Sequence, residues 1–227
     1  MRVALIPARG GSKRIPKKNI VPFAGKPMIS HAIELVQSTK LFDRIIVSTD
    51  NEEIAALARQ YGAETPFMRP EKESDDFATM TDVLLHFTEW LDKEKLAVNE
   101  ILCVFPATPL LQKEDIITGL NRMKELKASG AFTVCPFPSK IQRALKINNE
   151  GSLSFINSEF EFTRTQDLEE SFFDAGQFYW INKNDFQKEK KLVMAKSAPV
   201  IIEQLRAIDI DTPEDLLVAE TLYKAFK

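Results

Sequence analysis

Residues 3–19 read VALIPARGGSKRIPKKN, an apolar run that passes directly into a basic loop with two adjacent glycines. Residues 3–6 lack polar alternation, which is typical of a parallel strand that is buried on both faces. Five of the next thirteen residues are Lys or Arg. A loop at a strand end can direct backbone N–H groups and cations at a polyphosphate. The stretch therefore indicates an α/β fold whose first strand ends in either an anion site or a solvated basic turn.

The basic loop matches neither of two common phosphate-binding patterns. The chain contains no Walker A pattern, G-x-x-x-x-G-K-[ST], and no dinucleotide pattern, G-x-G-x-x-G. Arg9 and Lys13 instead flank residues 10–12, so two cations and several amides could face one phosphate chain. Lys18 and Asn19 follow at the far end of the loop, where Asn19 could equally be a turn residue.

The composition favours a globular domain that binds a small anionic ligand. The 227 residues carry a net charge of −3, which argues against nucleic acid as the main partner. Cys103 and Cys135 lie in apolar runs and are expected to be buried free thiols, without a disulfide framework or zinc site. No apolar run reaches the ~18 residues of a membrane span, and the first is too short for a signal peptide. We therefore expect a cytoplasmic protein with no membrane partner.

Strand and helix patterns alternate along most of the chain. Helical stripes are predicted over 27–38, 51–61, 79–94 and 114–128, and Thr212 with Pro213 suits the start of a last helix. Strands are predicted over 3–8, 44–50, 101–105, 131–135, 176–181, 200–202 and 206–210. This succession predicts a single α/β domain, residues 1–227, with a doubly wound and mostly parallel sheet.

Residues 138–175 interrupt the alternation, because they contain no long helical stripe. Residues 145–147 and 152–156 are predicted to form a hairpin around the turn-like stretch 148–151. We interpret the segment as a small inserted β element that covers the active site or contacts a second subunit.

Polar groups at the other strand ends are also candidates, because open α/β sheets bind ligands beyond the carboxyl ends of their strands. Asp50 follows the second strand and is expected to cap the next helix. Arg69 could bind a ligand or pair with Asp75 and Asp76, and the spacing leaves both open. Residues 106–109, PATP, form a stiff turn whose backbone could line a pocket.

Asp209 and Asp211 form the sharpest of these patterns. On a strand end they would alternate, so both side chains would point the same way. Two carboxylates on one side suit Mg²⁺ when a triphosphate supplies further oxygen ligands. The alternative is that Asp211 only helps Thr212 to cap the last helix.

Three stretches together resemble the CMP-sugar synthetases, the cytidylyltransferases that activate nonulosonic acids such as sialic acid. They are IPARGGSKRIPKKNI at 6–20, RP at 69–70 and IDIDTPED at 208–215. The resemblance implies a Rossmann-like domain and a homodimer built through the inserted element. It also implies an Mg²⁺-dependent reaction, in which the anomeric hydroxyl of the sugar attacks the α-phosphate of CTP and pyrophosphate leaves.

The resemblance also assigns roles to single residues. Arg9, Lys13 and Asp211 would act in catalysis, with Lys13 and Mg²⁺ stabilising charge that develops on the α-phosphate. Asp209 and Asp211 would be the metal ligands. The expected nucleotide-binding set is Ala8, Arg9, Gly10, Gly11, Ser12, Lys13, Lys18, Asn19, Arg69 and Thr79.

The sugar is indicated by two departures within the family. Sialic acid synthetases usually have a glutamine at the position of Phe105, and the stretch DAGQFYW at 174–180 looks like the pseudaminic acid cytidylyltransferases. Their sugar has acetamido and methyl groups where sialic acid has hydroxyls, so an aromatic wall would suit it. We expect Phe105, Gln177 and Tyr179 to face the sugar. The alternatives are a sialic or legionaminic acid cytidylyltransferase and, from another class, a catalytically silent nucleotide-binding module.

Overall fold

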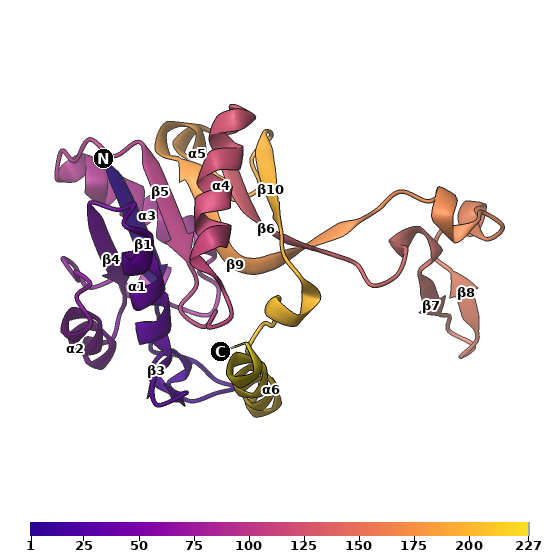
Figure 1. Ribbon diagram of the computed structural model, residues 1–227, viewed down its shortest axis with the longest axis horizontal. Helices are drawn as coiled ribbons and strands as arrows, with labels where there is room; N and C mark the ends of the chain where they lie inside the picture. Colours follow the sequence, from indigo (N-terminus) through magenta and orange to yellow (C-terminus); the bar gives the residue numbers. More distant parts are fainter. Residues whose placement is uncertain (227) are drawn as a thin grey trace.

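The computed structural model describes residues 1–226 and is built on a six-stranded sheet with the order β10-β6-β9-β5-β1-β4 (Figure 1). β1 pairs in parallel with β4 and β5, and β6 pairs in parallel with β10. β9 runs antiparallel between β5 and β6. The predicted mostly parallel α/β sheet is therefore confirmed. The strands are β1 Arg2–Pro7, β4 Arg44–Ser48, β5 Glu100–Val104, β6 Gly130–Pro136, β9 Phe172–Asn182 and β10 Ser197–Ile201.

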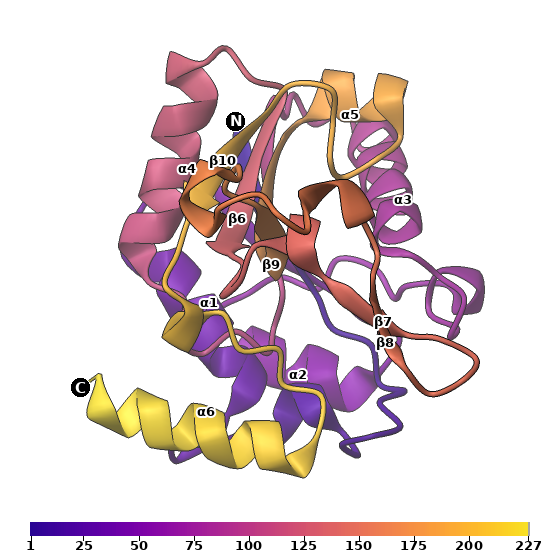
Figure 2. The ribbon, with the colours of Figure 1, turned by 90° about the vertical axis from the view of Figure 1, so that its right-hand side faces the viewer.

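Helices cover both faces of this sheet. Ala4 and Ile6 of β1 belong to the core shared with α1, α2 and α4, whereas Val3 and Leu5 belong to the core shared with α3. This two-sided burial explains the unbroken apolar run at the start of the chain. Figure 2 shows α4 on one side of the sheet and α3 with α5 on the other. The helices are α1 Met28–Thr39, α2 Glu52–Gln60, α3 Met80–Lys93, α4 Lys113–Glu125, α5 Lys183–Glu189 and α6 Pro213–Ala225.

Side-chain caps fix where several helices begin, α6 and α2 among them. Thr212 caps α6 in a capping box with Asp215, and Pro213 occupies the first turn, as the sequence predicts. The expectation that Asp50 caps α2 is wrong, because the cap is Asn51, whose side chain accepts the amide of Ile54 at 3.1 Å. Asp50 is thereby left available for another partner.

The segment between β6 and β9, residues 137–171, forms an inserted arm that extends away from the sheet (Figure 1). It contains the predicted hairpin, β7 Leu145–Ile147 paired antiparallel with β8 Leu153–Phe155. Several of its apolar side chains face solvent, among them Ile147, Leu153 and Phe162, which is 92% exposed. Its role as a dimerisation element stays a prediction.

The structure differs from the sequence prediction in several places. Residues 206–210 form no strand: a 3-10 turn, Gln204–Arg206, leads into a segment without regular structure, because Ile208 and Ile210 join a small separate core with α6. β9 begins at Phe172, earlier than predicted. The prediction also omitted α5, which buries a single apolar residue, Phe186, and the two-residue strands β2 Pro22–Phe23 and β3 Lys26–Pro27.

No helix within residues 1–226 is both long enough and apolar enough to cross a lipid bilayer.

Candidate active site

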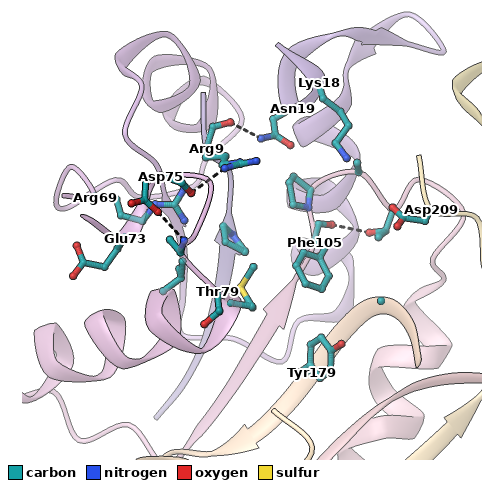
Figure 3. A pocket seen from close by; sticks show the side chains of 18 of the residues that line it. Arg9, Lys18, Asn19, Arg69, Glu73, Asp75, Thr79, Phe105, Tyr179 and Asp209 are labelled. Carbon is teal, nitrogen blue, oxygen red and sulfur yellow. Dashed lines mark hydrogen bonds between the residues drawn. The ribbon is translucent and has the colours of Figure 1, made fainter. Parts of the chain in front are cut away.

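Two adjoining cavities lie at the carboxyl end of β1 and share Arg9, Lys18 and Asn19 in their walls. The larger, of about 380 Å³, reaches from the basic loop past β5 to β9. Figure 3 shows it with Arg69 and Asp75 on one side, Lys18 and Asp209 on the other, and Phe105 and Tyr179 at its base. The smaller, of about 290 Å³, is lined also by Ser12, Lys13, Arg14 and Asp211. Eleven of the predicted site residues line the larger or the smaller cavity: Arg9, Ser12, Lys13, Lys18, Asn19, Arg69, Thr79, Phe105, Tyr179, Asp209 and Asp211.

The basic loop is held at both ends by main-chain contacts. The Gly10 amide donates to the Asp50 carboxylate at 2.8 Å, and the Asn19 side chain donates to the main-chain oxygen of Arg9 at 2.8 Å. A Cβ at Gly10 would lie 2.9 Å from the side-chain nitrogen of Asn51, so this close approach requires glycine. Three residues of the predicted nucleotide-binding set, Ala8, Gly10 and Gly11, line neither cavity. Ala8 is completely buried, and the two glycines form part of the loop backbone.

The cations of the loop converge on one carboxylate. A guanidinium nitrogen of Arg9 donates to the main-chain oxygen of Asp75 at 3.0 Å and to the carboxylate of Asp76 at 3.2 Å. Lys13 forms an ion pair with the same carboxylate and holds the pKa of Asp76 below its ordinary value. The two cations are thus close enough to bind one anion together, as a phosphate site requires.

Arg69 is buried, with 5% of its surface exposed, and its Nε donates to the hydroxyl of Ser74 at 3.1 Å. Burial lowers the pKa of its guanidinium. The sequence left open whether Arg69 pairs with Asp75 and Asp76. Those two residues bind Arg9 instead, and Arg69 lines the larger cavity.

Asp209 and Asp211 face this basic loop from the segment that precedes α6. Asp211 lies 2.8 Å from the guanidinium of Arg14 and 3.2 Å from the ammonium of Lys18. The Thr212 cap is completed by Asp215 and not by Asp211, so the capping alternative for Asp211 is wrong. Asp209 has no hydrogen-bond or ion-pair partner within residues 1–226. Its surface is exposed, yet partial loss of hydration, followed by the nearby charge of Asp211, raises its pKa.

These two carboxylates fit Mg²⁺ only in combination with a phosphate ligand. Residues 1–226 contain no group of three or more His, Cys, Asp or Glu side chains that could hold a metal ion. An unpaired carboxylate with a raised pKa is stabilised by a nearby cation, and Mg²⁺ commonly takes one or two carboxylates plus substrate phosphates and water. The donor set at Asp209 and Asp211 therefore suits a metal ion that arrives with a polyphosphate.

Phe105 and Tyr179 form the aromatic base of the larger cavity, with ring centroids 6.0 Å apart and nearly perpendicular. The Tyr179 hydroxyl donates to the carboxylate of Asp174, and burial together with this hydrogen bond raises the pKa of the phenol. Gly176, with a φ of 61°, also lines the cavity, in a backbone conformation that favours glycine.

The expectation that Gln177 faces the sugar is wrong. Its side chain is 1% exposed, lies outside both cavities and donates to the main-chain oxygen of Arg206. A register shift between Phe132 and Val134, where β6 pairs with β9, and the left-handed backbone at Gly176 break the strand alternation that would place Gln177 on the same face as Tyr179.

Sequence reasoning missed three residues that shape the site. Asp50 anchors the basic loop, and only its position after β4 gave a signal. Thr108, which is 6% exposed, lines the larger cavity and donates to the main-chain oxygen of Phe105 at 2.8 Å. It lies in the turn at 106–109, which the sequence did mark. Asp174 is held by Tyr179 and by the Gly176 amide at 2.9 Å.

A Rossmann-like sheet with a cationic loop facing two aspartates across a cavity suits a nucleotidyltransferase. The chain belongs to the cytidylyltransferase family, whose model matches residues 3–224.

Two curated relatives and one solved structure resemble the whole chain. Pseudaminic acid cytidylyltransferase of Campylobacter jejuni is 35% identical, covering 98% of this chain and 96% of the relative. CMP-N,N'-diacetyllegionaminic acid synthase of Legionella pneumophila is 30% identical, with the same coverage of 98% and 96%. A CMP:2-keto-3-deoxy-manno-octonic acid synthetase solved in complex with CTP has a TM-score of 0.73 at 18% identity, covering 100% of this chain and 99% of that one. This last likeness concerns the fold.

Proposed function

We propose that this chain transfers CMP from CTP to the anomeric hydroxyl of pseudaminic acid and releases pyrophosphate. The observation that carries the proposal is the pair of adjoining cavities that share Arg9, Lys18 and Asn19. Cations and amides line one end of this continuous site, and two aspartates and an aromatic base line the rest. It can therefore bind a triphosphate and a second substrate side by side.

The proposed reaction forms one bond and breaks another at the α-phosphorus. The anomeric oxygen bonds to phosphorus, the bond between the α-phosphorus and the bridging oxygen breaks, and pyrophosphate leaves with that electron pair. Loss of the hydroxyl proton to a carboxylate would make the anomeric oxygen a better nucleophile. Lys13 and Arg9 would stabilise charge on the phosphates, and their shared ion pairing with Asp76 supports this role. Mg²⁺ held by Asp209 and Asp211 would neutralise phosphate charge.

The choice of pseudaminic acid rests on the aromatic base and on the relatives. Phe105 and Tyr179 give the cavity an apolar floor, which suits methyl and acetamido groups better than a row of hydroxyls. The 35% identity to a pseudaminic acid cytidylyltransferase favours the same sugar over the legionaminic acid alternative, whose enzyme is 30% identical. Sialic acid is the remaining acceptor to compare.

Pyrophosphate release tests the proposal directly. The protein is incubated with CTP, Mg²⁺ and, in separate reactions, pseudaminic, legionaminic, sialic or 3-deoxy-octulosonic acid. Release that is fastest with pseudaminic acid is the expected result. Faster release with another acid would reject the sugar and keep the reaction, whereas CTP binding without release for any acid would indicate a silent nucleotide-binding module.

A homodimer formed through the inserted arm is part of the same proposal. The arm carries exposed apolar side chains on a two-stranded hairpin, including Ile147 at 73% and Leu153 at 69% exposure. A second copy could cover them. Light scattering should give twice the monomer mass, and Leu153→Asp should give a monomer, whereas Lys146→Asp controls for added charge. A monomeric wild type would reject the dimer.

We also infer a cytoplasmic location, where CTP is available. Two buried free thiols, Cys103 and Cys135, suit a reducing compartment. Localisation of a tagged chain in its own host would test this.

A further inference from the structure

A buried ion pair joins α4 to the segment that carries the two aspartates. The guanidinium of Arg206 binds both carboxylate oxygens of Asp115, one of them at 3.2 Å. The residues are 7% and 8% exposed. A two-pronged contact of this kind fixes direction as well as distance, because the planar guanidinium matches the carboxylate.

The surroundings of the pair hold each partner in one orientation. The Nε of Arg206 donates to Glu203 at 2.5 Å, and its main-chain oxygen accepts the side-chain amide of Gln177. Asp115 accepts the amide of Gln112 at 3.0 Å and thereby caps α4. Neither partner can turn away without leaving a buried polar group unpaired.

The pair lines neither cavity, but it joins two chain segments whose neighbouring residues line the larger one. Phe105 and Thr108, which line the cavity, lie shortly before α4 begins at Lys113, and Arg206 precedes Asp209 by three residues. The segment between Arg206 and Thr212 belongs to no helix or strand. Ile208 and Ile210 anchor the middle of this segment in the small core with α6, so its position depends on that packing and on the polar contacts at its two ends.

At the far end, the main-chain oxygen of Ile210 accepts the ammonium of Lys18 at 2.8 Å, and the Asp211 amide donates to Asp215 at 3.1 Å. At the near end, the ion pair between Arg206 and Asp115 connects the segment to α4. A shift of Arg206 would move Asp209 relative to the basic loop.

We propose that Asp115 and Arg206 are positioning residues, which set the place of Asp209 so that it meets a metal ion bound to the nucleotide. This inference rests on the proposed function. Stability alone is a weak reason for such a pair, because a buried ion pair can often be exchanged for apolar groups without loss of stability. What apolar groups do not reproduce is the fixed direction of the contact.

The test compares metal binding with nucleotide binding in four variants. Arg206→Lys keeps the charge and loses the fork, Asp115→Asn keeps the helix cap, and Asp115→Asn/Arg206→Met removes both charges together. Arg44→Lys is the matched control, since Arg44 forms a similar fork with Glu64 far from the site. Mn²⁺ binding in the presence of CTP is followed by electron paramagnetic resonance, and CTP binding without metal by calorimetry, with melting temperatures as the measure of folding.

We expect the three site variants to weaken Mn²⁺ binding by about tenfold or more while CTP binding without metal changes less than about threefold. The double variant should do so at a melting temperature close to that of the wild type. Mn²⁺ affinity equal to the wild type in the double variant, or losses in every variant that follow the melting temperature, would overturn the inference.

Failure of the proposed function is recognised separately. If the wild type binds Mn²⁺ with CTP but no acid releases pyrophosphate, the proposed reaction is rejected, and the variants still decide the positioning role. A wild type that binds no Mn²⁺ with CTP would overturn both.

Discussion

The ammonium group of Lys18 lies 2.8 Å from the main-chain oxygen of Ile210, a contact between residues 192 positions apart. It also lies 3.2 Å from the carboxylate of Asp211. Lys18 lines both cavities, so a single side chain connects the basic loop, the aspartate segment and the space between them. Its charge compensates the aspartates and can still attract a phosphate.

Under the proposed function, replacing Lys18 should therefore affect both the substrate site and the proposed metal site. Lys18→Met removes the donor to Ile210 and the charge beside Asp211, and we expect kcat/KM to fall about 100-fold, or ~2.7 kcal/mol. Lys17→Met is the control, because Lys17 pairs with Glu53 at the surface, and it should change kcat/KM less than about threefold. Equal effects of the two substitutions in steady-state kinetics would show that general loop charge matters and the Ile210 contact does not.

Asp76 forms ion pairs with both Arg9 and Lys13, and under the proposed function a phosphate of CTP would take its place. CTP binding must displace this carboxylate, so Asp76→Asn should tighten CTP binding about two- to fivefold at low salt. Asp167→Asn, which breaks an exposed ion pair on the arm, is the control and should leave the affinity unchanged. Calorimetry at two salt concentrations measures both, and weaker binding by Asp76→Asn would mean that Asp76 orients the cations for CTP.

The sheet could be predicted from sequence because burial leaves a direct trace in residue pattern. β1 is apolar on both faces since Ala4 and Ile6 face one helical layer and Val3 and Leu5 the other. The antiparallel direction of β9 leaves no such trace, because strand direction depends on which neighbour pairs with it. The strand predicted over 206–210 was wrong because alternation does not identify the packing partner. Ile208 and Ile210 alternate as in a strand but pack against α6.

The site could be predicted where chemistry is carried by residue type, and less well where it depends on partners. Arg9, Lys13 and the two aspartates are charged groups at expected strand ends and do line the cavities, Asp209 the larger and Lys13 with Asp211 the smaller. Asp50 and Asn51 are adjacent, and both residue types suit a helix cap. Asn51 is the cap, whereas Asp50 accepts the amide of Gly10, which is distant in sequence. The role of Gln177 likewise depended on Arg206, which sequence spacing does not connect to it.

A substitution at Gly119 tests how tightly helix α4 packs against β9. A Cβ at Gly119 would lie 2.8 Å from Trp180 and 3.0 Å from Phe178, two fully buried rings. Overpacking should outweigh the better helix propensity of alanine, so Gly119→Ala should destabilise the domain by about 1–2 kcal/mol. Gly11→Ala, whose Cβ meets nothing within 4 Å, should leave the denaturation midpoint unchanged. An equally stable Gly119→Ala would show that α4 can shift.

Cys103 gives a pH dependence with a definite sign. Complete burial raises the pKa of its thiol from 9.0 to about 12. The unfolded chain loses this proton above pH 9 while the folded chain retains it, so the free energy of unfolding should decrease between pH 9 and about 12, by up to ~1.4 kcal/mol per pH unit. Urea titrations of Cys135→Ala and of Cys103→Ala/Cys135→Ala isolate the effect, because only the first retains the thiol. Parallel pH profiles of the two variants would contradict it.

Tyr179 provides a test of the sugar end of the cavity. Tyr179→Phe keeps the aromatic floor and removes the donor to Asp174, which also accepts the Gly176 amide at 2.9 Å. Loss of one support should loosen the turn that places Gly176 on the cavity wall, so KM for the acid should rise about fivefold while KM for CTP changes less than about twofold. Tyr61→Phe, directly after α2, should change neither. If KM for CTP rose with that for the acid, Tyr179 would belong to the nucleotide end of the site, and the aromatic base would no longer support an apolar sugar.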